Sequence, residues 1–305
     1  DGTIVPRRFK HGGQELISYT IKDVQAVLKK RGSSFKRREK AEVIAIFSQK
    51  GGVGKSSYTQ QLGAMLSVVG KVLVIDLDSQ ADATSLFAVN IKHSVVESDE
   101  LEPSIMELID WTMSDNSDPG IVRMDFEQVV KEVSPTLHVI PADLDLSEVN
   151  YNLNRLPIAD RVGPDGSPVP GALYVIKEVV EQIQDRYDFI LFDLPTNIEV
   201  CNVAALFAAN RIIVPLELEA KCLKTMSRNE EFLDRLRSSH PGFNWDKVLV
   251  VPNKFMHQNI KIKALARIQD IYSGREDITL SQAIVPHSTI IDRCAESKEP
   301  VFVAA

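Results

Sequence analysis

Short continuous apolar runs alternate with helical stretches from Ala41 onward. We expect these runs to be strands: VIAIF (43–47), KVLVID (71–76), LHVI (137–140), DFILFD (188–193), RIIVP (211–215), KVLVV (247–251) and AIV (283–285). Apolar runs without alternation are typical of strands buried on both faces of a parallel sheet. Apolar residues at helical spacing lie between them, for example over 55–69, 173–185 and 225–238. The pattern predicts an α/β fold with a doubly wound, mostly parallel sheet flanked by helices, and ligands at the carboxyl ends of its strands.

Residues 1–40 follow a different pattern, with a single predicted helix. Apolar residues recur at helical spacing over 21–28, Thr20 is a suitable N-cap before them, and Gly32 is a suitable C-terminal stop. Because one helix is not stable alone, we expect residues 1–40 to be the end of a small helical domain followed by a linker. Residues 41–305 then form the main domain.

Positive charge is concentrated in this first part of the chain. The formal net charge of the 305 residues is −7, yet residues 29–40 carry seven basic side chains and one acidic side chain. An acidic protein with one basic segment often contacts a polyanion there. A solvated, flexible linker has the same composition, so this segment alone leaves both interpretations open.

The overall composition is that of a globular protein. Hydrophobic residues make up 44% of the chain and charged residues 25%, which is enough for a sizeable core and excludes a mostly disordered chain. No run of eighteen apolar residues is present, so we expect no membrane-spanning helix. The three cysteines are odd in number and far apart, which favours a reducing cytoplasm over a disulfide framework.

A glycine-rich segment follows the first predicted strand and precedes a helix. We expect its residues to bind the phosphates of a nucleotide: Gly51, Gly52, Val53, Gly54, Lys55, Ser56 and Ser57. Glycines let the backbone curl until several N–H groups point at one anion, and the helix dipole favours negative charge there. In a loop of this kind Lys55 contacts the β- and γ-phosphates, and the Ser56 hydroxyl binds Mg²⁺. An ordinary glycine-rich turn is the alternative.

Two further features bear on the chemistry of this loop. Lys50 precedes the glycines, where it is badly placed for its own γ-phosphate and better placed for the nucleotide of a facing subunit. The predicted strand 188–193 ends in Asp193, which is expected to hold Mg²⁺ together with Ser56. Asp76 and Asp78 end another strand, although on their own two such aspartates are more often turn formers.

The string K-G-G-V-G-K-S at 50–56 resembles the deviant Walker A loop of the family that contains the ParA partition ATPases, MinD and the nitrogenase iron protein. The segment 76–85 is similar to the partition-ATPase pattern D-x-D-P-Q-G-N-A-T-S, with Ser79, Ala81 and Asp82 as departures. The resemblance covers residues 41–303. It implies a P-loop NTPase fold, ATP and Mg²⁺ as ligands, and ATP hydrolysis in which Asp78 orients the attacking water.

The same resemblance extends to the base site and to the partners. Asn253 resembles the family's base-recognition residue, and Pro286 resembles a second element that packs on the purine. The resemblance implies an ATP-dependent homodimer that is bridged by Lys50 and binds DNA nonspecifically. It also implies release from DNA by a ParB-like adaptor and a location in the cytoplasm at the nucleoid.

The region before the loop resembles the end of the winged-helix domain of larger plasmid partition ATPases, which implies operator binding and autorepression. Candidate DNA contacts are Lys36, Arg37, Arg38, Lys261, Lys263 and Arg267. Each is also consistent with a linker or a solvated helix face. The remaining alternatives for the chain are a MinD-like or other cargo-positioning ATPase, a metabolic P-loop enzyme of the dethiobiotin synthetase type, and a DNA-binding regulator with a vestigial nucleotide site.

Overall fold

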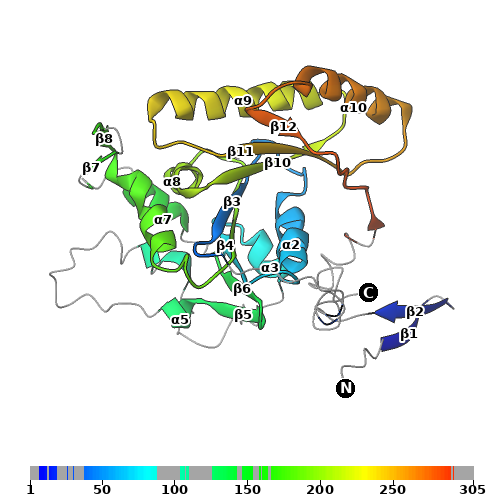
Figure 1. The fold of residues 1–305 in the computed structure, drawn as a ribbon, viewed down its shortest axis with the longest axis horizontal. Helices are drawn as coiled ribbons and strands as arrows, with labels where there is room; N and C mark the ends of the chain where they lie inside the picture. The colour runs from blue at the N-terminus through cyan, green and yellow to red at the C-terminus, as the bar shows by residue number, and fades with distance from the viewer. Residues whose placement is uncertain are drawn as a thin grey trace.

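An eight-stranded sheet forms the centre of the protein (Figure 1). The computed structural model describes residues 7–11, 14–18, 26, 30, 38–87, 104–106, 108–109, 126–142, 146–153, 158, 160–163, 166–289 and 291. In spatial order the strands are β12 (Ile278–Leu280), β11 (Lys247–Asn253), β10 (Arg211–Glu217), β3 (Glu42–Ile46), β9 (Phe189–Asp193), β4 (Val72–Asp76), β6 (Leu137–Ile140) and β5 (Lys131–Ser134). All neighbours are parallel except β5 and β6, so the predicted doubly wound, mostly parallel sheet is confirmed.

Helices cover both faces of this sheet. They are α2 (Lys55–Leu66), α3 (Asp82–Leu86), α5 (Phe126–Val129), α6 (Leu146–Leu153), α7 (Gly171–Glu181), α8 (Val200–Ala208), α9 (Cys222–Ser239) and α10 (Asn259–Tyr272). Ile44 and Ile46 of β3 belong to an apolar cluster with α2, while Val43 and Ala45 belong to a larger cluster with α6 to α10. Successive strand residues point to opposite faces, so a run that is apolar throughout is buried by both layers.

The strand order brings the carboxyl ends of the central strands together. Ile46 of β3 and Asp76 of β4 both pair with Asp193 of β9, because β9 lies between the other two strands. The chain after β3 leads into α2, and the chain after β10 leads into α9 on the other side. Ligands of open α/β sheets bind where connections diverge in this way, so the edge beyond Ile46, Asp76 and Asp193 is where a site is expected.

One predicted strand was wrong. Residues 283–285 are not a strand; β12 lies earlier, and the only pairing nearby among the described residues is an isolated bridge between Phe255 and Pro286. Ile278 is buried beneath α10, whereas Val285 is only half-buried and lines a cavity. The apolar run 283–285 is therefore explained by a cavity wall and not by burial between two helical layers.

Two short features were not predicted. β5 is a half-exposed edge strand without an apolar run, so it carries none of the pattern used to find the others. The Pro- and Gly-rich segment 155–171, expected to be a surface loop, contains a two-stranded ribbon of β7 (Arg161–Val162) and β8 (Pro168–Val169).

The first forty residues contain a β-hairpin that the helix prediction missed. β1 (Arg7–His11) pairs antiparallel with β2 (Gln14–Ser18), with Phe9 opposite Leu16. The intervening Gly12-Gly13 is a sequence signal for a two-residue hairpin turn. Of the helix expected at 21–31, only Ala26 and Lys30 are described, and both are helical. The winged-helix interpretation and the boundary at residue 40 stay predictions.

Candidate nucleotide-binding site

Two glycines give the loop between β3 and α2 its curl. Gly52 has φ of 72° and Gly54 has φ of 86°, in the left-handed region that favours glycine. A Cβ on Gly54 would also lie 3.1 Å from Asn253 Nδ2 and would crowd that amide, while the backbone conformation itself favours glycine. The loop then enters α2 at Lys55.

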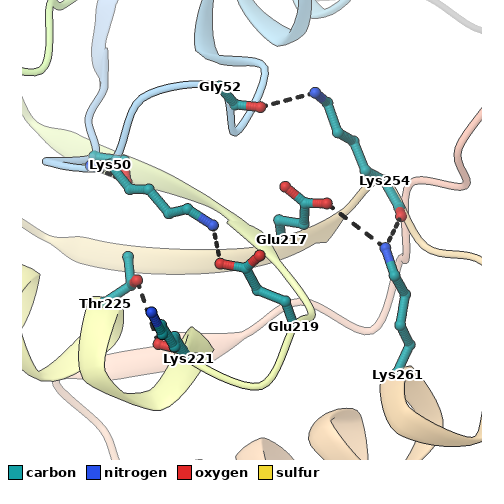
Figure 2. A network of polar contacts seen from close by, with 9 residues as sticks. Lys50, Gly52, Glu217, Glu219, Lys221, Thr225, Lys254 and Lys261 are labelled. Atoms are coloured by element: carbon teal, nitrogen blue, oxygen red, sulfur yellow. Dashed lines mark hydrogen bonds and ion pairs between the residues drawn. The ribbon is translucent and has the colours of Figure 1, made fainter.

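The end of β11 braces this loop from one side. Asn253 Nδ2 donates to the Val53 carbonyl at 2.7 Å. Lys254 Nζ donates to the Gly52 carbonyl at 2.8 Å, as Figure 2 shows. Among the described residues the N–H groups of Gly52, Val53 and Gly54 have no hydrogen-bond acceptor. The loop therefore has its carbonyls occupied and its amides available to an anion, as a phosphate cradle requires.

Lys55 lies at the bottom of the cradle, next to acidic side chains. Its side chain is buried, and burial lowers the pKa of the Lys55 ammonium, while Asp193, Asp78 and Asp82 oppose that shift. The three nearby carboxylates favour the charged form of the Lys55 ammonium, so the cradle contains a buried cation that can bind phosphate oxygens.

Asp193 has one carboxylate oxygen that the fold leaves unpaired. Thr59 Oγ1 donates to Asp193 Oδ1 at 2.7 Å, while the buried Oδ2 has no hydrogen-bond partner among the described residues. Burial raises the pKa of Asp193, and the neighbouring Ser56 and Thr59 hydroxyls oppose the shift. A carboxylate oxygen beside a serine hydroxyl is a suitable ligand pair for Mg²⁺, so Ser56 and Asp193 fit the metal expected from the sequence.

The two aspartates at the end of β4 have different environments. Asp76 is fully buried, and its carboxylate accepts hydrogen bonds from Thr84 N and Thr84 Oγ1, both at 2.7 Å, and from Asp78 N at 3.0 Å. Burial and the neighbouring Asp193 raise the pKa of Asp76. Asp76 therefore organises the turn. Asp78 is half-buried and accepts from Gln80 N at 3.0 Å, which leaves its carboxylate accessible beside Lys55.

A cavity of about 320 Å³ lies on the α2 side of the cradle. Ser57, Asn253 and Pro286 all line it, although Pro286 comes from the far end of the chain. Backbone bonds from Phe255 N to Val285 O (3.0 Å) and from His287 N to Phe255 O (2.8 Å) hold the Pro286 segment against the end of β11. The remaining wall is mostly apolar, as a purine base requires, with Tyr58, Leu62, Met65 and Val285.

Lys50 lies on the opposite side of the loop from this cavity and points away from the cradle. Its ammonium forms an ion pair with Glu219, which lies between β10 and α9 (Figure 2). The Lys50 side chain is 29% exposed, so it is not enclosed in the apolar core. The two lysines of the loop thus face different directions, Lys55 into the cradle and Lys50 toward α9.

The candidate DNA-binding residues are not equivalent. Lys36 and Arg37 lie outside the described residues. Arg38 is ion-paired with Glu42 at 2.6 Å and covers the Phe189 ring. Lys261 is buried. Its Nζ donates to the Lys254 carbonyl at 2.8 Å and lies 3.7 Å from Glu217 (Figure 2). Lys263 and Arg267 are exposed on α10.

Four residues around the loop were not predicted to act there. Thr59 is four residues after Lys55, so helical spacing places it beside the cradle. Lys254 directly follows Asn253 and has a positive φ of 52°, which its sequence does not indicate. Asn229 of α9 accepts a hydrogen bond from Gln49 N at 3.1 Å, and Glu219 lies just before α9. Neither residue is part of a motif, so only the packing of this region against the loop reveals them.

Replacement of Thr59 by valine tests the bond to Asp193. The substitution keeps the shape but leaves a second oxygen of a buried carboxylate without a donor, so we expect a loss of about 1–3 kcal/mol in the free energy of unfolding. Urea denaturation measures it, and Thr279→Val on the edge strand β12 is the control. Equal denaturation midpoints for Thr59→Val and the unmodified protein would contradict the role of this bond.

A phosphate cradle after β3, with carboxylates at the ends of β4 and β9 of a parallel sheet, defines the P-loop nucleoside triphosphatase class. The family model described as an AAA domain matches residues 41–242. The chain belongs to this family, in its ParA and MinD branch. In the part of the chain that the structure describes, no helix is long and apolar enough to cross a membrane.

Two named relatives are similar in sequence, and one solved structure is similar in fold. The chain is 22% identical over 267 residues to the sporulation initiation inhibitor protein Soj of Bacillus subtilis, covering 86% of this chain and 90% of Soj. It is 29% identical over 200 residues to the chromosome partitioning protein ParA of Caulobacter vibrioides, covering 65% of this chain and 64% of ParA. The ATP complex of a single-residue variant of Cyanothece McdA superposes with a TM-score of 0.65 at 19% identity, covering 87% of this chain and 90% of McdA.

Proposed function

We propose that this chain is a DNA-partition ATPase that forms an ATP-dependent sandwich dimer. The observation that carries the proposal is that the side chains of the two loop lysines, Lys50 and Lys55, point in different directions. Lys55 is buried among the site carboxylates, whereas Lys50 lies outside the cradle, half-exposed, with Glu219 as its partner. A cation in that position is directed toward a facing molecule and not toward its own nucleotide.

Each residue of the site has a definite part in the reaction. The free amides of Gly52, Val53 and Gly54 and the Lys55 ammonium bind the phosphates. Asn253, Ser57 and Pro286 line the cavity for adenine. Bound Mg²⁺ would be held by Ser56 and Asp193 and would offset the charge that develops on the phosphates. Asp78 accepts a hydrogen bond from the attacking water and orients it.

The dimer is proposed to bind DNA nonspecifically, by contacts to phosphates that carry no sequence information. Lys263 and Arg267 are exposed and remain candidates, whereas the buried Lys261 is left out. Slow hydrolysis, stimulated by a ParB-like adaptor on the cargo, would release the dimer from the nucleoid. Autorepression of an operon rests on the winged-helix prediction for residues 1–40.

One gel-shift series tests this function against its rivals. We expect the chain to retard random-sequence DNA more strongly with ATP than with ADP or without nucleotide, and the ATP-dependent part to weaken as salt is raised. Binding that ignores the nucleotide would favour a DNA-binding regulator with a vestigial site. Nucleotide binding without any DNA binding would favour a MinD-like ATPase or a metabolic P-loop enzyme.

A further inference from the structure

A recess of about 430 Å³ opens between the start of the phosphate loop and the first turns of α9. The loop contributes Gln49, Lys50 and Gly51, and the α9 side contributes Glu219, Lys221, Lys224, Thr225 and Arg228. Four of these side chains are cations and one is an anion. Figure 2 shows Lys50 reaching across this recess to Glu219, with Lys221 and Thr225 on the facing turn of α9.

Three of the four cations have no ion-pair partner in the part of the chain that the structure describes. Glu219 is the ion-pair partner of Lys50, and no described residue forms an ion pair with Lys221, Lys224 or Arg228. Lys221 is the N-cap of α9, and Lys224 and Arg228 follow at the three- and four-residue spacing that places side chains on one helix face. The recess therefore carries an excess of positive charge from one face of one helix.

This arrangement costs stability in the isolated chain. Like charges at helical spacing repel one another. The amino-terminal end of a helix carries partial positive charge, which disfavours Lys221 and Lys224, and the first turn of α9 has no acidic residue to compensate. An anion in the recess would relieve both effects, so the charge pattern is suited to a phosphate-bearing ligand.

The recess is fixed in position relative to the phosphate loop. Asn229 is fully buried on α9, and its Oδ1 accepts a hydrogen bond from Gln49 N at 3.1 Å. This bond joins the second turn of α9 to the residue before Lys50. The helix that carries Lys224 and Arg228 is therefore tied to the segment that carries Lys50, and all three side chains line the same recess.

We propose that this recess binds the phosphates of the nucleotide held by a second copy of this chain, with Lys221, Lys224 and Arg228 as contacts additional to Lys50. The inference rests on the proposed function, because it takes Lys50 to face the partner in the closed dimer. Since Lys50 lines the recess, whatever Lys50 contacts on the partner also enters the recess. In the unbound chain, Glu219 neutralises one of the four positive charges of the recess by pairing with Lys50.

Removal of two recess cations tests the proposal. The double variant Lys224→Gln/Arg228→Gln is compared with Lys263→Gln/Arg267→Gln, which removes the same residue types at the same spacing from α10. Sedimentation with AMPPNP measures dimerisation, and a fluorescent ATP analogue at low protein concentration measures nucleotide binding by single chains. We expect the recess variant to dimerise at least tenfold more weakly, the loss of about one charge-assisted hydrogen bond per copy, with unchanged nucleotide binding.

The control variant should dimerise normally, and Arg228→Lys should retain most of the affinity because it keeps the charge. Equal weakening in both double variants would overturn the proposal. Normal dimerisation of the recess variant with lost DNA binding would also overturn it, in favour of a nucleic-acid surface. If Lys50→Ala prevents dimerisation and the recess variant does not, the recess proposal fails while the proposed function stands. If the unmodified chain does not dimerise with AMPPNP, the proposed function fails, and the recess proposal fails with it.

Discussion

Lys50→Ala should abolish ATP-dependent association while leaving nucleotide binding by the single chain nearly intact. The Lys50 ammonium points away from its own cradle, whose amides and Lys55 remain in place after the substitution. A symmetric dimer loses the contact twice, and each charge-assisted hydrogen bond is worth about 1.5–3 kcal/mol. The dimer should therefore be weakened by about 10²–10⁴-fold, as measured by sedimentation with AMPPNP.

Glu219→Gln is the matched control for Lys50→Ala. It removes the same intramolecular ion pair but keeps the lysine, so it distinguishes the effect of losing the ion pair from the effect of losing the Lys50 charge. If Lys50 acts on a facing molecule, Glu219→Gln should associate at least as well as the unmodified chain. Equal loss of association in Glu219→Gln and Lys50→Ala would indicate that the ion pair only supports the local fold, and the cross-subunit role of Lys50 would be abandoned.

Asp78→Ala should stop ATP turnover without preventing ATP binding or ATP-dependent DNA binding. Asp78 is the accessible carboxylate at the end of β4, since Asp76 is buried and its oxygens are occupied by Thr84 and by the Asp78 amide. Loss of a group that orients the attacking water typically costs about 10²–10⁴-fold in rate. Phosphate release under saturating ATP measures the effect, with the gel shift as the second readout.

Asp82→Ala is the control for Asp78→Ala. Asp82 is exposed in the same segment and also interacts with Lys55, so it has the same charge but lacks the position at the end of the strand. We expect its turnover to stay within a few-fold of the unmodified rate. Unchanged turnover in Asp78→Ala would remove Asp78 from the mechanism, and equal losses in both variants would reduce its effect to electrostatics around Lys55.

The linear pattern was sufficient for the elements that are buried on both sides. Six of the seven predicted strands correspond to β3, β4, β6, β9, β10 and β11, because a strand between two helical layers must be apolar along its whole length. The seventh, 283–285, failed because a half-buried cavity wall has the same composition. The edge strand β5 was missed because a half-exposed strand carries no continuous apolar run, and the sequences of β1 and β2 contain no such run either.

Some residues of the candidate site could likewise be predicted from the sequence, and others could not. Local order along the chain was enough to locate the glycine-rich turn at 51–54 between a strand and a helix, since such a turn is built from consecutive residues. The same holds for Asp193 at the end of β9 and for Asp78, two residues after the end of β4. Packing across the sheet determined the rest. The partners Thr59 for Asp193, Lys254 for Gly52 and Glu219 for Lys50 follow from which strands are neighbours and how the helices lie on them. The burial of Lys261, which contacts the Lys254 carbonyl and Glu217, also follows from packing. The sequence shows that this residue is charged, but whether a charged side chain is exposed depends on contacts between distant segments.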